Sequence, residues 1–171
     1  KDINSFPKKK WATDGSGIGA ERRVINSLFI DPDSLEKQNY NLFSKYELLK
    51  RDETQYEEYM IEDAEYILVA YGTVARVCRS AVDILRGRGI KAGLFRPITL
   101  FPYPTDRLFK IADKEELKFF ISVELSMGQM IEDLKLAVNG KKKVNFFGKV
   151  GGNVMSPEDI VDNLISKIEE N

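Results

Sequence analysis

The stretch Ala64-Glu-Tyr-Ile-Leu-Val-Ala-Tyr-Gly-Thr73 decides the fold of this chain. Its centre, residues 66–70, is an apolar run of strand length, with charge before it and Gly72 after it. From residue 74 the apolar residues recur at helical spacing along one stripe, which comprises Val74, Val77, Cys78, Ala81, Val82 and Leu85. A second apolar strand follows over residues 92–95. Strand, helix and strand with tight connections form a βαβ unit, which predicts a parallel sheet.

The ends of this first helix carry recognisable signals. Thr73 is placed to cap the helix N-terminus, and Gly87 and Gly89 are placed to end it. A buried, small apolar role is expected for Cys78, because it lies on the apolar stripe of the helix.

The rest of the C-terminal half repeats this alternation. After a proline-rich segment (residues 96–104) and a short helix near residues 108–112, a third strand covers residues 119–123 and ends in Glu124. Ser126 and Gln129 have the spacing of a capping box before a helix that ends at Asn139-Gly140. A fourth strand (144–147) and a last helix opened by Ser156-Pro-Glu-Asp159 complete the pattern. The sequence therefore predicts an α/β three-layer sandwich with a mainly parallel sheet, over residues 64–171.

Residues 1–63 are expected to form a connector and a helical N-terminal appendage. Residues 1–30 look irregular, and Gly15-x-Gly17-x-Gly19 lacks the preceding strand that a nucleotide-binding loop needs. From Pro32 to about Asp63 the pattern favours a long charged helix, or two helices with a break near Asp52. Its apolar and aromatic face cannot be stable alone, so we expect it to lie against the sheet domain or a partner subunit. That face comprises Leu35, Leu42, Phe43, Tyr46, Leu49, Tyr56, Tyr59 and Met60.

The composition limits the kinds of catalysis, metal binding and partner that are expected for this chain. Of the 171 residues, 26 are basic and 27 acidic, so the net charge of −1 favours neither nucleic acid nor a membrane surface as partner. The absence of His excludes His-based catalysis and His metal sites within this chain. The single cysteine can form no internal disulfide and can hold no iron–sulfur cluster alone, so no metal site is expected. No membrane span or signal peptide is evident, which favours the cytoplasm. Because the sequence begins with Lys1 rather than Met, we expect a piece of a longer protein.

Candidate functional residues gather where ligands of open α/β sheets bind, beyond the carboxyl ends of the strands. Helix N-termini there offer N–H groups to an anion, and Glu124 is expected to act as a supporting acid or to pair with Arg96. Each residue also has an ordinary structural role as a cap, a salt bridge or a turn. No complete active site is evident, so no catalytic residue is assigned. The interface or ligand-proximal candidates are Tyr71, Thr73, Arg96, Glu124, Ser126 and Gln129.

Four ordered motifs resemble the alpha subunits of 2-oxoacid:ferredoxin oxidoreductases, and most of all the branched-chain (2-oxoisovalerate) type. The resemblance covers essentially the whole chain, including the approach to the first strand over residues 57–64. The motifs are Ala70-Tyr-Gly-Thr-Val-Ala-Arg76, Leu94-Phe-Arg-Pro-Ile-Thr-Leu-Phe-Pro-Tyr-Pro104, Val123-Glu-Leu-Ser-Met-Gly-Gln-Met-Ile-Glu-Asp133 and Phe147-Gly-Lys-Val-Gly-Gly152.

The resemblance implies a transketolase C-terminal-like domain that serves assembly and interface roles. For the whole enzyme it implies oxidative decarboxylation of a 2-oxoacid to an acyl-CoA, with reduction of ferredoxin. Thiamine diphosphate, magnesium and iron–sulfur clusters would belong to the whole complex, and the isolated chain would be inactive and bind none of them. The implied partners are the other subunits, ferredoxin, coenzyme A and the 2-oxoacid.

Two alternatives stay open on the sequence. One is the equivalent domain of a transketolase or of a 2-oxoacid dehydrogenase beta subunit, and the other is a free-standing α/β ligand-binding module. A homodimer through the exposed sheet edge or the aromatic-rich helix also stays open, as do the identity of the 2-oxoacid and the strand order.

Overall fold

The computed structural model describes residues 2–7, 9, 11–12 and 26–170. The chain divides into two compact units, residues 1–44 and residues 45–171. Among the described residues before Pro32, Ile3–Ser5 form a short 3-10 turn, and the others have no regular structure. The loop expected at residues 13–19, with its three glycines, lies outside the described residues.

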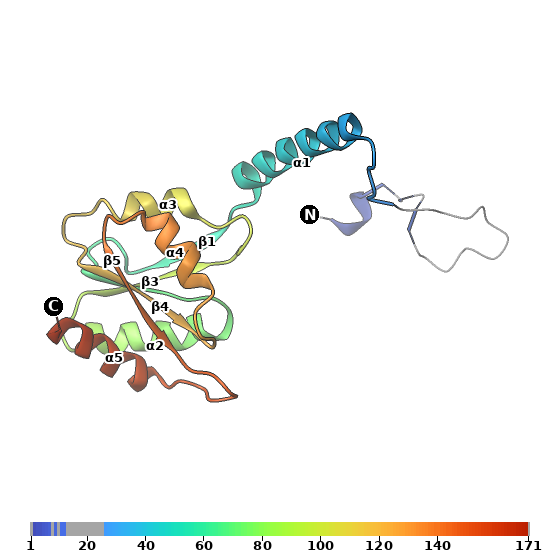
Figure 1. Cartoon of the computed structure of the whole chain (residues 1–171). Helices are drawn as coiled ribbons and strands as arrows, with labels where there is room; N and C mark the ends of the chain where they lie inside the picture. The colour runs from blue at the N-terminus through green and yellow to red at the C-terminus, as the bar shows by residue number, and fades with distance from the viewer. Residues whose placement is uncertain (1, 8, 10, 13–25, 171) are drawn as a thin grey trace. The chain divides into compact units, whose positions relative to one another are not determined.

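A five-stranded sheet organises the second unit (Figure 1). Its strand order is β1-β3-β2-β4-β5, and β3, β2, β4 and β5 run parallel while β1 runs antiparallel to β3. The βαβ prediction is confirmed, because β2 and β3 pair in parallel with Tyr66 opposite Ala92. The strands are β1 (Tyr56–Tyr59), β2 (Tyr66–Val69), β3 (Ala92–Pro97), β4 (Phe119–Glu124) and β5 (Lys143–Gly148).

Helices cover both faces of the sheet, which confirms the three-layer sandwich (Figure 1). On one face lie α2 (Gly72–Gly87) and α5 (Pro157–Glu169), packed on a core that includes Leu68 and Ile121. On the other face lie α3 (Thr105–Ile111) and α4 (Met130–Val138), packed on a core that includes Ile67 and Phe120. Because successive strand residues point to opposite faces, β2, β3 and β4 each contribute to both cores.

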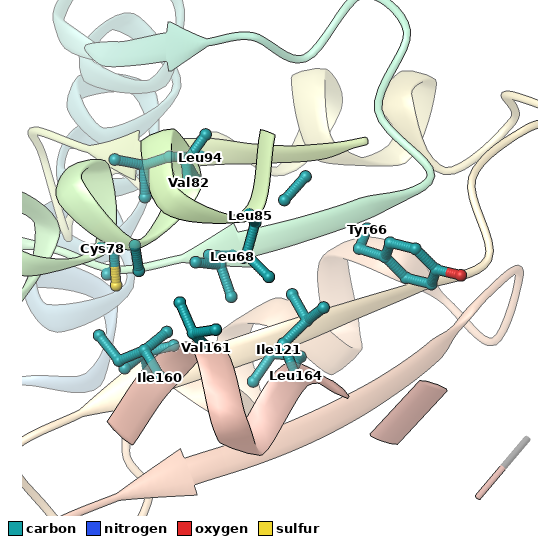
Figure 2. Close-up of a cluster of buried hydrophobic side chains, with 14 of the residues drawn as sticks. Tyr66, Leu68, Cys78, Val82, Leu85, Leu94, Ile121, Ile160, Val161 and Leu164 are labelled. Atoms are coloured by element: carbon teal, nitrogen blue, oxygen red, sulfur yellow. The ribbon is translucent and has the colours of Figure 1, made fainter. Parts of the chain in front are cut away.

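Figure 2 shows the core between the sheet and the α2–α5 layer. Leu85 of α2 and Leu164 of α5 are fully buried beside Leu68 of β2. Cys78 is also fully buried, and burial raises the pKa of its thiol, which keeps the thiol protonated and unreactive. The prediction of a structural cysteine is therefore confirmed.

One element differs from its prediction. The long helix α1 (Pro32–Glu53) ends where a break was considered, but residues 56–59 form strand β1 and not a second helix. β1 is held by tertiary pairing, with Tyr56 opposite Pro97 and Tyr59 opposite Leu94, and Tyr56 stacks on Phe95. A four-residue strand of this kind forms because the neighbouring strand provides its hydrogen bonds. Its own sequence therefore gives little indication of a strand.

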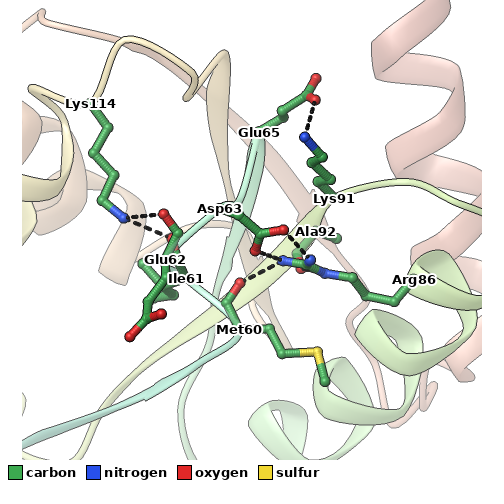
Figure 3. Close-up of polar contacts among 9 residues, drawn as sticks. All are labelled: Met60, Ile61, Glu62, Asp63, Glu65, Arg86, Lys91, Ala92 and Lys114. Atoms are coloured by element: carbon green, nitrogen blue, oxygen red, sulfur yellow. Dashed lines mark hydrogen bonds and ion pairs between the residues drawn. The ribbon is translucent and has the colours of Figure 1, made fainter.

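A polar clamp fastens the segment that joins β1 to β2 (Figure 3). The Arg86 guanidinium donates hydrogen bonds to both carboxylate oxygens of Asp63 and to the backbone carbonyl oxygens of Met60 and Ala92, at 2.7–2.8 Å. From the other side, Lys114 donates to the backbone carbonyl oxygens of residues 61 and 62 at 2.9 Å. The clamp therefore ties edge strand β1 to helix α2 and to the segment before β4.

The same segment runs very close to β3. A Cβ atom on Gly93 would lie 2.7 Å from the carbonyl oxygen of Met60, so this position needs glycine. Met60 itself adopts a left-handed conformation with φ of 51°, which turns the chain from β1 toward β2.

Candidate functional site

The topology brings the carboxyl ends of four parallel strands to one edge of the sheet. Val69 near the end of β2 is level with Phe95 in β3 and Ser122 in β4, and Glu124 at the end of β4 is level with Gly148 in β5. The four segments expected to converge, residues 71–73, 96–97, 124–126 and 148–152, follow these strand ends. Their convergence at one edge is therefore confirmed.

Glu124 is the most constrained polar residue of this edge. Only 1% of it is exposed, and its carboxylate accepts five hydrogen bonds. Two come from the hydroxyls of Ser122 and Ser126, at 2.8 and 2.9 Å. Three come from the backbone N–H groups of residues 129, 130 and 131, at 2.9–3.1 Å, where α4 begins. A strand-end carboxylate thus caps the following helix from inside the protein.

These hydrogen bonds keep Glu124 ionised. Burial acts to raise the pKa of its carboxyl, but the N–H of Gln129 and the two serine hydroxyls outweigh burial and hold the pKa below its ordinary value. The partial positive charge of the helix N-terminus favours the same charged form. The anion site that the α4 N-terminus could offer is therefore filled by the protein's own carboxylate.

The capping box predicted for Ser126 and Gln129 is wrong. Gln129 is the N-cap of α4, but within the described part of the chain its side chain makes no capping hydrogen bond. The Ser126 hydroxyl accepts a hydrogen bond from the N–H of Gly128 at 3.1 Å and donates to Glu124. Ser126 therefore shapes the loop before the helix, while the long-range carboxylate of Glu124 does the capping.

The predicted pair of Arg96 and Glu124 is also wrong. Strand β2 lies between β3 and β4, and the two side chains leave the sheet on opposite faces. Arg96 alternates with Leu94 on the α2 face, whereas Glu124 alternates with Phe120 on the α4 face. Arg96 instead donates to Glu57 of β1 at 2.9 Å, and its buried Nε has no hydrogen-bond partner among the described residues.

Tyr71 and Thr73 bracket the start of α2. Tyr71 is the N-cap residue and packs partly buried against the α3–α4 core, while Thr73 is exposed in the first turn. The prediction that Thr73 caps α2 is therefore wrong: the N-cap lies two residues earlier, at Tyr71, and the helix begins at Gly72, whose φ of 58° suits glycine. In the described chain the Tyr71 side chain makes no capping hydrogen bond either.

Exposed apolar side chains cluster on two neighbouring loops of this edge. The loops touch, because the N–H of Lys149 donates to the carbonyl oxygen of Glu124, and a Cβ on Gly148 would lie 2.6 Å from the carbonyl oxygen of Ser126. Met127 is 83% exposed and Val154 69% exposed. We call this set the carboxyl-edge apolar surface; it comprises Leu125, Met127, Val150 and Val154.

A groove of about 970 Å³ lies beside the same edge. The proline-rich segment of residues 100–107 forms one wall, and the end of α1 with β1 forms the other. Two of its charges pair with each other: Arg107 binds the carboxylate of Glu58, with 2.9 Å between Nη2 and Oε2. The hydroxyl of Tyr103 is buried there, and within the described residues it has no hydrogen-bond partner. Burial, together with the carboxylates of Asp133 and Glu124, raises the pKa of Tyr103.

Two contributors to this edge had no clear sequence signal. Glu57 partners Arg96 from the missed strand β1, whose sequence Tyr-Glu-Glu-Tyr has no alternation of apolar and polar residues that would have predicted a strand. Lys149 binds Asp159 at 2.7 Å and so fastens the β5–α5 loop to the capping box of α5. The prediction that Ser156-Pro-Glu-Asp159 opens the last helix is confirmed, and the structure adds that Ser156 and Asp159 form a capping box there.

The described residues do not fit a resident metal or cluster. In residues 2–7, 9, 11–12 and 26–170, no three His, Cys, Asp or Glu side chains lie together as metal ligands. The single thiol is fully buried in the α2–α5 core. In that same part of the chain, no helix has the length and apolar character to cross a membrane.

Solved structures share this fold. A 2-oxoglutarate:ferredoxin oxidoreductase from Magnetococcus marinus superposes with a TM-score of 0.67 and 20% identity, over 82% of this chain and 24% of that chain. A split-gene transketolase, solved as an inactive beta4 tetramer, superposes with a TM-score of 0.55 and 15% identity, over 67% of this chain and 41% of that chain. The fold is therefore the α/β arrangement found in transketolase-like proteins.

Curated relatives are much closer in sequence. The ketoisovalerate oxidoreductase subunit VorB of Methanothermobacter marburgensis is 47% identical over 162 residues, and the VorB of Methanothermobacter thermautotrophicus is 42% identical over the same length. Each match covers 95% of this chain and 45% of the relative, so the chain spans a little under half the length of these relatives. A 2-oxoglutarate synthase subunit KorA of Methanocaldococcus jannaschii is 32% identical over 98 residues, which are 57% of this chain and 26% of the relative.

Residues 64–160 match the family model of the pyruvate:ferredoxin oxidoreductase core domain II. The match extends from the start of the β2 segment into α5 and so includes every parallel strand and the whole carboxyl edge. The chain belongs to this family.

Proposed function

We propose that this chain is the C-terminal part of the alpha subunit of a 2-oxoacid:ferredoxin oxidoreductase of the branched-chain type. The observation that carries the proposal is the 47% identity to a ketoisovalerate oxidoreductase subunit over 95% of the chain. The similarity to a 2-oxoglutarate synthase subunit, 32% over 57% of the chain, is weaker and supports the same class of enzyme. The proposed reaction is the oxidative decarboxylation of a branched-chain 2-oxoacid to an acyl-CoA, with transfer of electrons to ferredoxin.

Within that enzyme, the role of this domain is assembly. Its buried charged residue at the carboxyl edge, Glu124, is saturated by five hydrogen bonds and is not free to act on a substrate. The cofactors of the proposed reaction, thiamine diphosphate with magnesium and the iron–sulfur clusters, belong on other domains or subunits. Residues 1–63 are the connector into this domain, and its partners are the other subunits, ferredoxin, coenzyme A and the 2-oxoacid. The carboxyl edge offers a surface to a neighbouring domain or subunit, framed by Tyr71, Thr73, Arg96, Ser126 and Gln129.

The carboxyl-edge apolar surface supports this role. Met127 stands 83% exposed on a loop whose base is fastened by Glu124. An exposed methionine on a rigid base, beside exposed aliphatic side chains of the adjacent loop, is typical of a protein–protein contact. The buried Glu124 therefore acts as a positioning residue that presents this surface.

The enzymatic proposal is tested on the native protein purified from its source with an antibody against this chain. We expect a larger polypeptide in a brown complex that reduces viologen in the presence of branched-chain 2-oxoacids and coenzyme A. A colourless protein of this size without such activity would overturn the proposal and favour a free-standing binding module.

The assembly role is tested separately in the whole complex. Met127→Asp, and substitution of Arg96 or Glu124, should reduce the recovery of intact complex and its turnover. Leu136→Asp is the matched control, because Leu136 is a similarly exposed apolar residue on the outer side of α4. Unchanged assembly and turnover in the Arg96 and Glu124 variants would contradict the assembly role while leaving the enzymatic proposal intact.

A further inference from the structure

Helix α1 carries an apolar stripe that the described chain covers only in part, with Leu42 and Leu49 half-buried. The helix is 22 residues long, and none of its residues is buried by the described chain. Phe43 is 63% exposed, and Leu35 and Tyr46 are exposed as well. A single amphipathic helix of this length is marginal in water unless its apolar face is packed, so the stripe needs a partner.

The spacing of the stripe is that of a coiled-coil seam. Leu35, Leu42 and Leu49 are seven residues apart, and Asn39 and Tyr46 lie between them at alternating steps of four and three residues. This is a heptad pattern with leucine at each d position and with Asn39 and Tyr46 at a positions. The ring of Tyr46 packs edge to face against the ring of Phe101, with 5.8 Å between the ring centroids, and 41% of Tyr46 stays exposed.

The charges beside the seam select one occupant and one orientation. When two copies of α1 run antiparallel with Phe43 at the two-fold axis, Glu36 of one copy faces Lys50 of the other, and this pair occurs twice. The two Phe43 side chains meet between these ion pairs. In a parallel pair, by contrast, Glu36 would face Asp31 of the other copy and Lys50 would face Lys45, which are like-charge contacts.

We propose that the apolar stripe of α1 binds the same stripe of a second copy of this chain in an antiparallel, two-fold symmetric helix pair. In the single chain, Lys50 forms an exposed ion pair with Glu47 of its own helix, with 2.8 Å between Nζ and Oε1. In the helix pair, Lys50 forms an ion pair with Glu36 of the second copy instead. Lys45 meets its own counterpart on the opposite flank, where water screens the repulsion. The pairing is independent of the proposed enzymatic activity.

The first test is a sulfhydryl cross-link. Because Cys78 is fully buried, Phe43→Cys introduces the one accessible thiol of the described chain, and it lies at the two-fold axis. Mild oxidation should convert most of this variant into a disulfide-linked dimer. Ser44→Cys is the matched control: its thiol lies on the outer side of the same helix and should stay largely monomeric. Equal cross-linking of the two variants would contradict the two-fold axis at Phe43.

The second test is a charge exchange followed by sedimentation equilibrium of the whole chain. Glu36→Lys and Lys50→Glu should each weaken the dimer roughly tenfold, and the double variant should recover the original affinity. In a parallel pair Glu36→Lys would instead strengthen the dimer, since the introduced lysine would then face Asp31. A chain that stays monomeric up to about 100 µM would overturn the proposal and leave the stripe for a different protein. An unchanged circular dichroism spectrum of each variant shows that a lost dimer is not lost folding.

Discussion

At the scale of single residues, Glu124 links the fold of this domain to its proposed role. It joins the end of β4, the loop of residues 125–129 and the first turn of α4 through one carboxylate. A buried carboxylate is stable when all its acceptor positions are filled, and here five donors fill them. The exposed side chain of Met127 is therefore carried by a loop that is tied to the core at its base.

Glu124→Gln should lower the free energy of unfolding by about 2–4 kcal/mol, because an amide NH2 group would face hydroxyl and N–H donors without an acceptor. Urea unfolding followed by circular dichroism measures the effect. Glu132→Gln is the matched control, since Glu132 forms an exposed ion pair with Lys135 on the same helix and should cost less than about 0.5 kcal/mol. Similar losses in the two variants would show that the buried hydrogen bonds do not stabilise the helix start.

Asp159 should make stability depend on acid pH. Its pKa is lowered from 3.8 to about 2, first by the hydrogen bond from Lys149 and then by the N–H and hydroxyl of Ser156. Because the folded state holds the lower pKa, the stabilisation is complete above about pH 4 and is lost as the pH falls toward 2. Asp159→Asn should flatten this part of the pH profile of the urea midpoint. A profile that keeps the slope of the unsubstituted protein between pH 4 and 2 would contradict the pKa shift.

At the scale of elements, strand β1 has little strand propensity of its own and is held in place by contacts with neighbouring elements. Its four residues pair with β3, and the segment that follows is clamped by Arg86 and Lys114 (Figure 3). Because the clamp contacts backbone carbonyl oxygens as well as the Asp63 carboxylate, it holds the path of the chain and not one side chain alone. Edge strand β1 thereby presents Glu57 to Arg96 at the carboxyl edge.

Arg86→Met should release this clamp. We expect a loss of about 1–3 kcal/mol in the free energy of unfolding and faster hydrogen exchange of the amides in residues 60–66, because four hydrogen bonds from one guanidinium disappear. Arg88→Met, two residues further on and exposed, is the matched control and should change neither quantity. Uniform exchange changes across the sheet would instead indicate general destabilisation.

At the scale of the whole molecule, stability is concentrated in residues 45–171. Every buried hydrophobic residue of the described chain lies at or after Ile61, and both cores are built mainly from β2 to β4 and the helices α2 to α5. The family match over residues 64–160 covers nearly the same region. Residues 26–44 supply no buried hydrophobic residue, and Leu28, Ile30 and Phe43 are each more than half exposed.

Removal of residues 1–44 should therefore leave the melting temperature of the sheet domain within about 2 °C, because none of the described residues in this segment belongs to either core. Differential scanning calorimetry measures this, and near-ultraviolet circular dichroism checks that the aromatic environment of the core is retained. The shortened chain should also be monomeric, since half of the α1 stripe is gone. A fall of more than about 5 °C would show that the removed segment supports the core directly.

The sequence by itself determined the elements whose signals are local. The apolar run of residues 66–70, the helical stripe through Cys78, and the helix start at Ser156-Pro-Glu-Asp159 each depend on neighbours a few residues apart, and all are confirmed. The alternation of such elements also determined the parallel sheet and the convergence of four strand ends at one edge.

The tertiary structure alone decided the contacts between distant residues. Strand order separates Arg96 from Glu124 and pairs Arg96 with Glu57, 39 residues earlier in the chain. Glu124 replaces the expected local caps of α4 because burial at a strand end brings its carboxylate to the helix N-terminus. Local propensity cannot predict such contacts, because they stabilise the protein only after the sheet has formed and brought the two distant residues together.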